Sequence, residues 1–193
     1  FFVSLLCFIF WIKSTTIKEK RICVMIQDAF LDRLKEISSV FLIGGCVRNS
    51  LYGIPIKDID CIVFNVKDEN LFEDLLLDCV KNRFGGWRYS GDINVDFWKL
   101  EDSYNGQYDF KIPEDILDYV IFNMDAILYD IDNQKYIKHD AYKQFEQKQI
   151  VDFLNMDLKH YDKQVNKIKR YQRYFNISDT LKKLIEKNGD NNC

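Results

Sequence analysis

The chain has few of the residues that interrupt or cross-link a fold: two prolines, eight glycines and two histidines among 193 residues. Its six cysteines, at positions 7, 23, 46, 61, 79 and 193, form no CxxC pair and follow no regular spacing. The irregular spacing of the cysteines and the scarcity of histidine argue against a zinc site, and the same cysteine spacing argues against a disulfide framework. We therefore expect reduced, mostly buried thiols, as in a cytoplasmic protein.

An excess of charge of one sign is also missing. The formal net charge is −3, so the chain as a whole lacks the basic signature of a nucleic-acid-binding domain. The stretch 157–187 is a local exception, with nine Lys and Arg against four Asp and Glu. A solvated helix face and a phosphate-tracking surface both explain such a stretch, and a solvated face is the commoner case.

The most apolar stretch, Phe1–Ile12, is shorter than the ~20 residues that a transmembrane helix needs. It has neither a basic region before it nor a clear small-residue cleavage site after it. An amphipathic pattern starts near Met25, so the working domain is predicted to begin there, and residues 1–24 are given no functional role. No stable membrane association is expected.

The remainder alternates between helical and extended patterns. Apolar residues at helical spacing predict helices over 26–37, 46–52, 71–80, 142–148, 156–175 and 178–187, with Ser178 as an N-cap. Short apolar runs predict strands over 40–43, 59–64, 87–89, 93–100, 119–122, 126–131 and 135–137. This pattern predicts a small mixed domain over 25–155, followed by a helical extension over 156–190.

The most informative stretch is Val40–Phe64, which reads as strand, Gly-Gly turn, short helix, Asp-x-Asp and strand. Gly44 and Gly45 allow the backbone to approach an anion, and the helix behind them offers unpaired N–H groups to it. Asp58 and Asp60 point the same way from the mouth of a strand, where they can hold divalent cations. A phosphate cradle followed by a carboxylate pair is typical of phosphoryl or nucleotidyl transfer.

This stretch, IGGCVRNSLYGIPIKDID, resembles the head domain of the class II nucleotidyltransferases, the family of tRNA CCA-adding enzymes and bacterial poly(A) polymerases. The family signature is GG-x-VR-D, then L-x-G, then Lys or Gln before Asp-x-Asp. Two weaker likenesses extend it: FNMDAILYDIDNQKYI resembles the second hairpin of the head, and VNKIKRYQRYF the first helix of the neck. The signature positions that match in register are Gly44, Gly45, Val47, Arg48, Leu51, Gly53, Lys57, Asp58 and Asp60.

The resemblance implies an α+β fold: a polymerase-beta-like nucleotidyltransferase head domain with a small mixed sheet flanked by helices, plus a short helical neck. It implies transfer of NMP from an NTP, ATP or CTP, to a hydroxyl acceptor such as an RNA 3′ end. Asp58 and Asp60 would then ligate two Mg²⁺ ions, which makes both residues catalytic as well as metal-binding.

Nucleotide and phosphate contacts are predicted for Gly44, Gly45, Arg48 and Lys57, with pairing to a carboxylate as the alternative role of Arg48. A third carboxylate in this family usually comes from a neighbouring strand and helps to deprotonate the incoming hydroxyl. Asp96 is the candidate, because VDFWKL presents it in mid-strand beside apolar residues. A solvent-facing strand residue is the alternative, and Glu101 and Asp102 are reserves.

Three departures from the family pattern limit the prediction. Asn49 replaces the usual Asp, Leu117 and Asp118 stand where the family has paired arginines, and the E-D-x-x-R motif of the neck is absent. A short, stand-alone head-domain enzyme is therefore expected, rather than a full CCA-adding enzyme. A non-catalytic nucleotide-binding module and a truncated subunit of an RNA-modifying enzyme are the alternatives. The base, the acceptor and the oligomeric state stay open.

Overall fold

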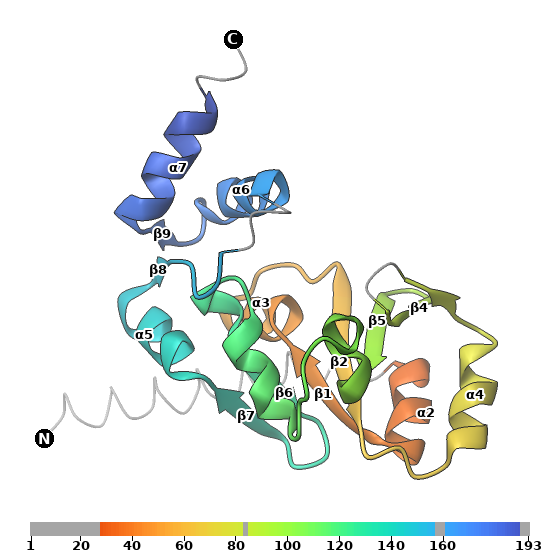
Figure 1. Cartoon of the computed structure of the whole chain (residues 1–193). Coiled ribbons are helices and arrows are strands. Elements are labelled where there is room, and N and C mark those ends of the chain that lie inside the picture. The colour runs from red at the N-terminus through yellow and green to blue at the C-terminus, as the bar shows by residue number, and fades with distance from the viewer. Residues whose placement is uncertain (1–27, 83–84, 157–160, 190–193) are drawn as a thin grey trace, which may run out of the picture.

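The computed structural model describes residues 28–82, 85–156 and 161–189, and the stretch 1–24 lies outside them (Figure 1). No helix in these described ranges is long and apolar enough to cross a membrane. In chain order, the elements are α2 (Ala29–Ile37), β1 (Ser39–Ile43), α3 (Gly45–Tyr52), β2 (Asp58–Phe64), α4 (Glu69–Leu76), β3 (Val80–Lys81), β4 (Trp87–Ser90), β5 (Asn94–Lys99), the 3₁₀ helices η1 (Leu100–Gly106), η2 (Pro113–Tyr119) and η3 (Asn123–Asp125), β6 (Ile127–Asp130), β7 (Lys135–Lys138), α5 (Asp140–Lys148), β8 (Ile150–Val151), α6 (Tyr161–Tyr171), β9 (Asn176–Ile177) and α7 (Asp179–Gly189).

A seven-stranded mixed sheet forms the centre, in the order β3-β4-β5-β2-β1-β6-β7, with helices around it (Figure 1). β2 and β5 run parallel, and every other neighbouring pair in this sheet is antiparallel. The register of the parallel pair places Asp60 directly beside Asp96. The fold class predicted from the sequence is confirmed in these features.

Alternation along β2 divides the interior into two clusters, because successive side chains point to opposite faces of a sheet. Ile59, Cys61 and Val63 join the larger cluster, to which α2, α4 and α5 also contribute. Ile62 joins a smaller cluster on the other face, covered by η2. Asp58 and Asp60 share the parity of Ile62, so they lie on the face of the smaller cluster.

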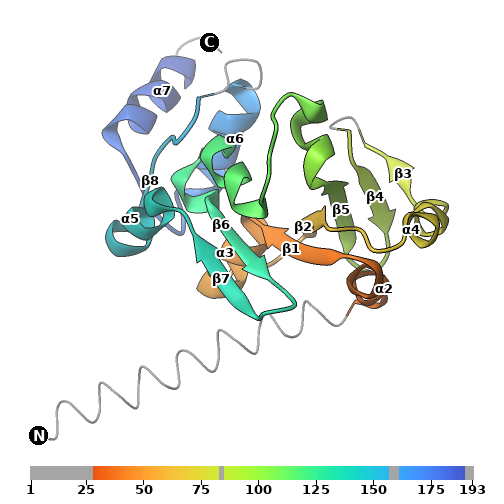
Figure 2. The same cartoon turned by 60° about the horizontal axis from the view of Figure 1, so that its bottom comes forward.

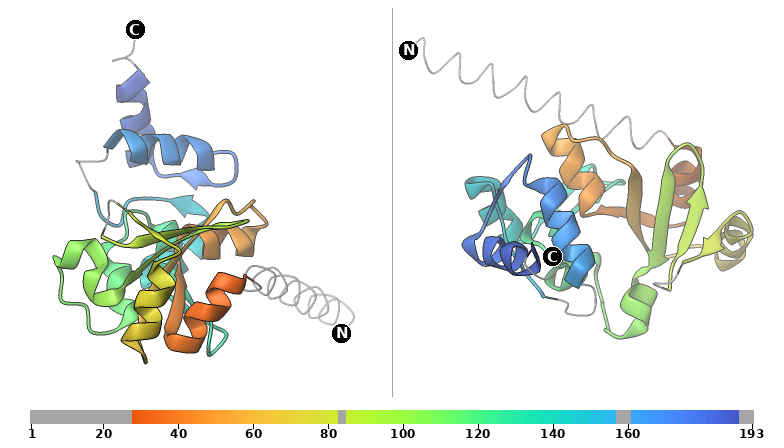
Figure 3. Two further views of the ribbon diagram at one scale, coloured as in Figure 1. Left: turned by 90° about the vertical axis from the view of Figure 1, so that its right-hand side faces the viewer. Right: turned by 90° about the horizontal axis from the view of Figure 1, so that it is seen from above.

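The C-terminal helices pack against the rest of the chain through the larger cluster. Ile168 of α6, Leu181 of α7 and the intervening Phe175 are buried members of it. A short parallel pair, β8 with β9, joins the chain before α6 to the chain after it. Figure 2 and the left view of Figure 3 show α6 and α7 together at one end of the molecule. The boundary predicted between residues 155 and 156 stays a prediction.

Most predicted elements are confirmed, and three are wrong in whole or in part. The predicted helix 71–80 ends at Leu76, and Val80 instead begins β3, where it pairs with Arg88. Of the predicted helix 156–175, α6 covers Tyr161–Tyr171 among the described residues, and neither Met156 nor residues 172–175 are helical. The predicted strand 119–122 does not form, because η2 extends through Tyr119 and Phe122 makes only an isolated bridge to Phe153. The predicted N-cap is confirmed, since Ser178 Oγ accepts a hydrogen bond from the Leu181 amide at 3.3 Å.

The shared core predicts that α6 unfolds together with the sheet. Ile168→Ala removes a fully buried side chain and is expected to cost about 2–4 kcal/mol of unfolding free energy. Urea unfolding should show one transition moved as a whole to lower denaturant, while the exposed neighbour variant Lys169→Ala changes little. A separate early transition confined to helix signal would contradict the shared core.

Candidate active site

The Gly44-Gly45 turn brings the start of α3 against β6 and η3. Gly44 has φ 65° and ψ −116°, a conformation that favours glycine, and its N–H donates to the Ile127 carbonyl at 3.0 Å. A Cβ at Gly44 would lie 3.6 Å from the Asp125 carbonyl oxygen. The Gly44 amide is therefore used within the fold, and the groups that remain for an anion come from the first turn of α3.

The N-terminus of α3 is suited to an anion. Among the described residues, no side chain caps this helix at Gly44. The first N–H groups of a helix have no partner within it, and the helix dipole favours negative charge there. The predicted phosphate-binding turn thus has the expected local structure, with Gly45 opening the helix.

Three carboxylates come together on the parallel pair β2 and β5. Asp58 is exposed, Asp60 is partly buried, and Asp96 is the register partner of Asp60. Burial, and then the negative charges of Asp58 and Asp96, raise the pKa of Asp60 to about 7. A cation would relieve this concentration of negative charge. The structure therefore brings the three predicted catalytic carboxylates into one electrostatic neighbourhood.

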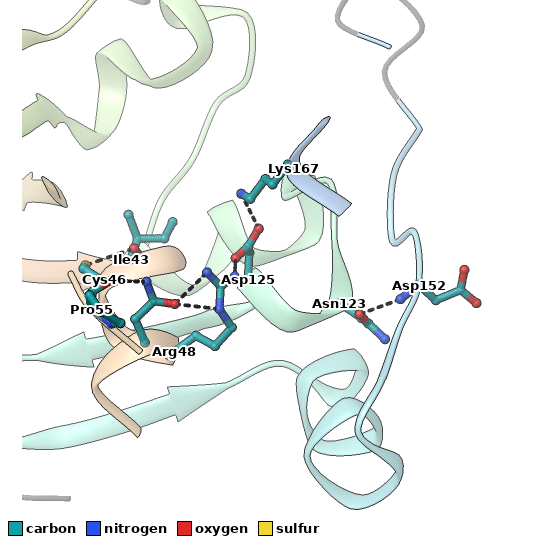
Figure 4. Close-up of polar contacts among 9 residues, drawn as sticks. Ile43, Cys46, Arg48, Pro55, Asn123, Asp125, Asp152 and Lys167 are labelled. Atoms are coloured by element: carbon teal, nitrogen blue, oxygen red, sulfur yellow. Dashed lines mark hydrogen bonds and ion pairs between the residues drawn. The ribbon is translucent and has the colours of Figure 1, made fainter. Parts of the chain in front are cut away.

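The Arg48 side chain is fully buried rather than directed at solvent. It forms an ion pair with Asp125, and it donates to the Asn49 side-chain oxygen from Nε at 3.2 Å and from Nη2 at 2.9 Å (Figure 4). Its guanidinium also lies 4.1 Å from the ring centre of Tyr171. Arg48 thus pairs with a carboxylate in this structure, which is the alternative role considered for it. Its contact with a phosphate stays a prediction.

Asp125 joins Arg48 to the C-terminal helix. Its second carboxylate oxygen accepts from Lys167 Nζ at 2.7 Å, so α6 is linked to η3 and α3 through one side chain (Figure 4). Burial alone would raise the pKa of Asp125, but Lys167 and Arg48 outweigh it and hold the pKa below its usual value. The positive charge of Lys167 also acts to lower the pKa of Asp60. A residue of α6 therefore contributes to the electrostatic environment of Asp60.

Asp96 is already engaged by a neighbour on the next strand. Arg88 Nε donates to Asp96 Oδ1 at 2.8 Å, and Arg88 Nη2 donates to Asp96 Oδ2. The reserve candidates Glu101 and Asp102 lie in η1, beyond the far end of β5, so the structure does not bring them to Asp58 and Asp60. Lys57 is exposed directly before Asp58 and stays a candidate for phosphate.

The carboxylates present match only part of the ligand set of a magnesium ion. In the described ranges, no group of three or more His, Cys, Asp or Glu side chains is close enough to hold a metal ion. Mg²⁺ keeps several waters and is usually bound by one or two carboxylates together with substrate phosphates. Asp58 and Asp60 match that partial set. A preformed cage of three protein carboxylates, with Asp96 as the third, is not present.

Three residues that the sequence did not single out belong to this neighbourhood: Arg88, Asp125 and Lys167. Each contacts a partner at least eight positions away, so no local motif reveals the pair. The one available signal was for Arg88, which stands on the strand expected to pair with the strand of Asp96. Asn123 has a structural role: its side chain donates to the Ile150 carbonyl and accepts from the Asp152 amide.

A cavity of about 410 Å³ lies away from these carboxylates. It opens between α4, β4 and η1, and its lining includes Phe72, Trp87 and Lys99. None of the three aspartates lines it. The cavity is therefore separate from Asp58, Asp60 and Asp96.

No protein-family model and no curated protein sequence matches the chain. Solved structures do match it. A CCA-adding enzyme in complex with CTP is 21% identical at a TM-score of 0.54, covering 84% of this chain and 39% of that one. The Thermotoga maritima CCA-adding enzyme complexed with tRNA is 20% identical at a TM-score of 0.56, covering 82% and 39%. A tRNA nucleotidyltransferase with a primer tRNA and an incoming ATP analog is 15% identical at a TM-score of 0.57, covering 77% and 46%.

These matches establish a nucleotidyltransferase fold. More specifically, the chain has a domain like the head of the class II nucleotidyltransferases, as the sequence resemblance predicted. It spans less than half the length of each of these three solved chains.

The raised pKa of Asp60 predicts a pH-dependent effect of Asp60→Asn. The native carboxyl, with a pKa of about 7, keeps its proton at pH values where an unfolded carboxyl, near 3.8, has lost it. Stability therefore falls as pH rises between these two values, and Asn removes this loss. In EDTA, the variant should be more stable than the parent at pH 8, on the order of 2 kcal/mol, and equal to it at pH 4. Urea unfolding at both pH values, beside the exposed control Asp32→Asn, measures this difference, and an equal effect at both would contradict it.

Among the ion-paired residues Arg48, Asp125 and Lys167, substitutions are expected to lower the unfolding free energy by unequal amounts. Asp125→Ala leaves the buried Arg48 without its carboxylate, and we expect a loss of about 3–5 kcal/mol in unfolding free energy. Lys167→Met removes a side chain that is 33% exposed and leaves the Arg48–Asp125 pair intact, so a loss of about 1 kcal/mol is expected. Urea titration with Lys169→Met as the exposed control measures both. Equal losses in the two variants would show that Asp125 is not the centre of the cluster.

Proposed function

We propose that this chain is a Mg²⁺-dependent nucleotidyltransferase, which moves NMP from an NTP to a hydroxyl acceptor. The observation that carries the proposal is the combination of Asp58, Asp60 and Asp96 on the parallel strands β2 and β5, next to an uncapped helix N-terminus that follows a Gly-Gly turn. The fold similarity to CCA-adding enzymes supports the same reaction class.

The roles follow from the positions. Asp58 and Asp60 would hold Mg²⁺, with the remaining ligands supplied by water and triphosphate oxygens. When bound, the metal would neutralise charge on the triphosphate and promote loss of the proton from the attacking hydroxyl. The first turn of α3 would accept the phosphates, together with Lys57. Lys167 would limit the repulsion between Asp60 and an incoming anion, since its ammonium acts on Asp60.

ATP or CTP is the proposed nucleotide, and an RNA 3′ end the proposed acceptor. The support comes from solved neighbours that are complexes with CTP, with ATP and with tRNA. The basic residues of α6 and α7, such as Lys163, Arg170 and Lys182, are exposed at one end of the molecule and would suit a phosphate backbone. A cytoplasmic enzyme of RNA processing fits this proposal.

One observation favours the alternative, a nucleotide-binding module without catalysis. Asp96 is engaged by Arg88 at both oxygens, and Arg48 is buried in an internal cluster. Two of the predicted active-site residues are therefore paired within the protein. A module of this kind would bind an NTP but transfer nothing.

The proposal is tested by incubating the protein with each labelled NTP, Mg²⁺ and total RNA. The double variant Asp58→Asn/Asp60→Asn should lose at least about a hundredfold of label transfer, because the metal ligands are neutralised. Asp32→Asn, an exposed carboxylate on α2, should keep full transfer. Because Asp60→Asn is expected to stabilise the metal-free protein, loss of folding is an inadequate explanation for lost transfer.

Transfer that survives in the double variant would overturn the assignment of Asp58 and Asp60. Retained NTP binding with no transfer to any acceptor, in the parent protein, would favour the non-catalytic module. The two outcomes are separated by measuring NTP binding, by filter retention of the labelled nucleotide, in the same samples.

A further inference from the structure

Arg88 lies on β4, the strand next to the one that carries Asp96. In the antiparallel pair of β4 with β5, Arg88 is the register partner of Asp96, and Asp96 is in turn the partner of Asp60 in the parallel pair. The three side chains thus belong to three adjacent strands at one level of the sheet. Neighbouring strands are about 4.8 Å apart, so one guanidinium can reach two carboxylates across this row.

Arg88 and Asp96 are joined by two hydrogen bonds. Nε and Nη2 of the guanidinium donate to separate oxygens of the carboxylate, which is the bidentate geometry that Arg adopts with carboxylates. Neither Asp96 oxygen is then left without a hydrogen-bond donor. Each oxygen keeps a second lone pair, but a metal ion that approached it would lie beside the guanidinium, so the two positive charges compete for the Asp96 carboxylate.

The positive charge of Arg88 also interacts with carboxylates other than its partner Asp96. Its pKa is raised mainly by Asp96, and also by Asp58 and Asp60. The Arg88 side chain is 46% exposed, whereas that of Asp96 is 14% exposed. The guanidinium can therefore move towards solvent, while the Asp96 carboxylate stays in the site.

The surface ion pair Arg33–Asp78 offers a contrast. It joins two half-exposed side chains through a single contact of 2.9 Å, on α2 and just after α4. Such surface pairs contribute little to stability. Arg88 differs because it stands among three carboxylates that share a face, and this makes the pair more than a surface contact.

We infer that Arg88 is a positioning residue that competes with a divalent cation for Asp96, so that Asp96 ligates metal only after the guanidinium has moved away. This inference rests on the proposed function, because it assumes that Asp58 and Asp60 hold the metal. In this role, the guanidinium of Arg88 neutralises Asp96 while no metal is bound, and the metal ion must displace the guanidinium from Asp96.

The inference predicts that Arg88→Gln binds divalent cations more tightly. Removing one positive charge from beside the site should lower the dissociation constant for Mn²⁺ about tenfold at low salt, and less at high salt. Free Mn²⁺ measured by electron paramagnetic resonance, in titrations without nucleotide, gives this constant independently of activity. Arg33→Gln, which removes the same charge from the distant surface pair, should bind Mn²⁺ as the parent does.

Two further variants separate competition at Asp96 from a general charge effect. Arg88→Lys keeps the charge but loses the two-pronged contact, so its affinity should lie between those of the parent and Arg88→Gln. In an Asp96→Asn background, Arg88→Gln should change the affinity by a much smaller factor, because the contested ligand is already gone. An undiminished effect in that background would overturn the inference.

Failure of the inference and failure of the proposed function give different results. If the parent binds Mn²⁺ at a site that Asp58→Asn/Asp60→Asn abolishes, but Arg88→Gln binds no more tightly, only the role of Arg88 is overturned. If neither the parent nor Arg88→Gln binds Mn²⁺ in a way that depends on Asp58 and Asp60, the metal site and the inference are both overturned.

Discussion

The buried carboxylate of Asp125 is the interaction on which the arrangement of the site depends. It lies between Arg48 of α3 and Lys167 of α6, while its backbone borders the Gly44 turn. A buried charge is costly unless it is paired, and here two cations satisfy it. The Gly44-Gly45 turn, η3 and the C-terminal helix α6 are therefore held in one relative position. The candidate site that the sequence places on β1, α3, β2 and β5 is thereby linked to α6.

The same physics explains why basic side chains surround the carboxylate row. Burial, and then the negative charges of Asp58 and Asp96, raise the pKa of Asp60, and a nearby cation offsets part of this effect. Lys167 approaches this row from α6, and Arg88 approaches it from β4. Both cationic side chains are partly exposed, so solvent reaches each of them. The protein thus offers an internal charge balance that substrate and metal would rearrange.

The parts of the site that the sequence predicts well are those set by local rules. The Gly-Gly turn, the short helix after it and the Asp-x-Asp spacing all follow from backbone conformation and from strand parity, whereas the position of Asp96 beside Asp60 depends on the pairing of β2 with β5. The partners of Arg48 and Asp96 could not be predicted in this way, since Asp125 and Arg88 reach them through tertiary pairing. The false strand at 119–122 has a related cause: its apolar residues pack as a 3₁₀ helix and an isolated bridge, and local patterning does not separate these from a strand.

The short parallel pair of β8 with β9 has a consequence for α6. Because Ile150–Val151 bonds to Asn176–Ile177, the chain that carries α6 leaves and returns at the same place. α6 is therefore tethered at both ends, and its effective concentration at the surface it packs against is high. If Lys167 and Tyr171 separate from Asp125 and Arg48, they would rebind quickly and in the same register. A transient opening at the acidic row can thus occur without loss of the helix from the fold.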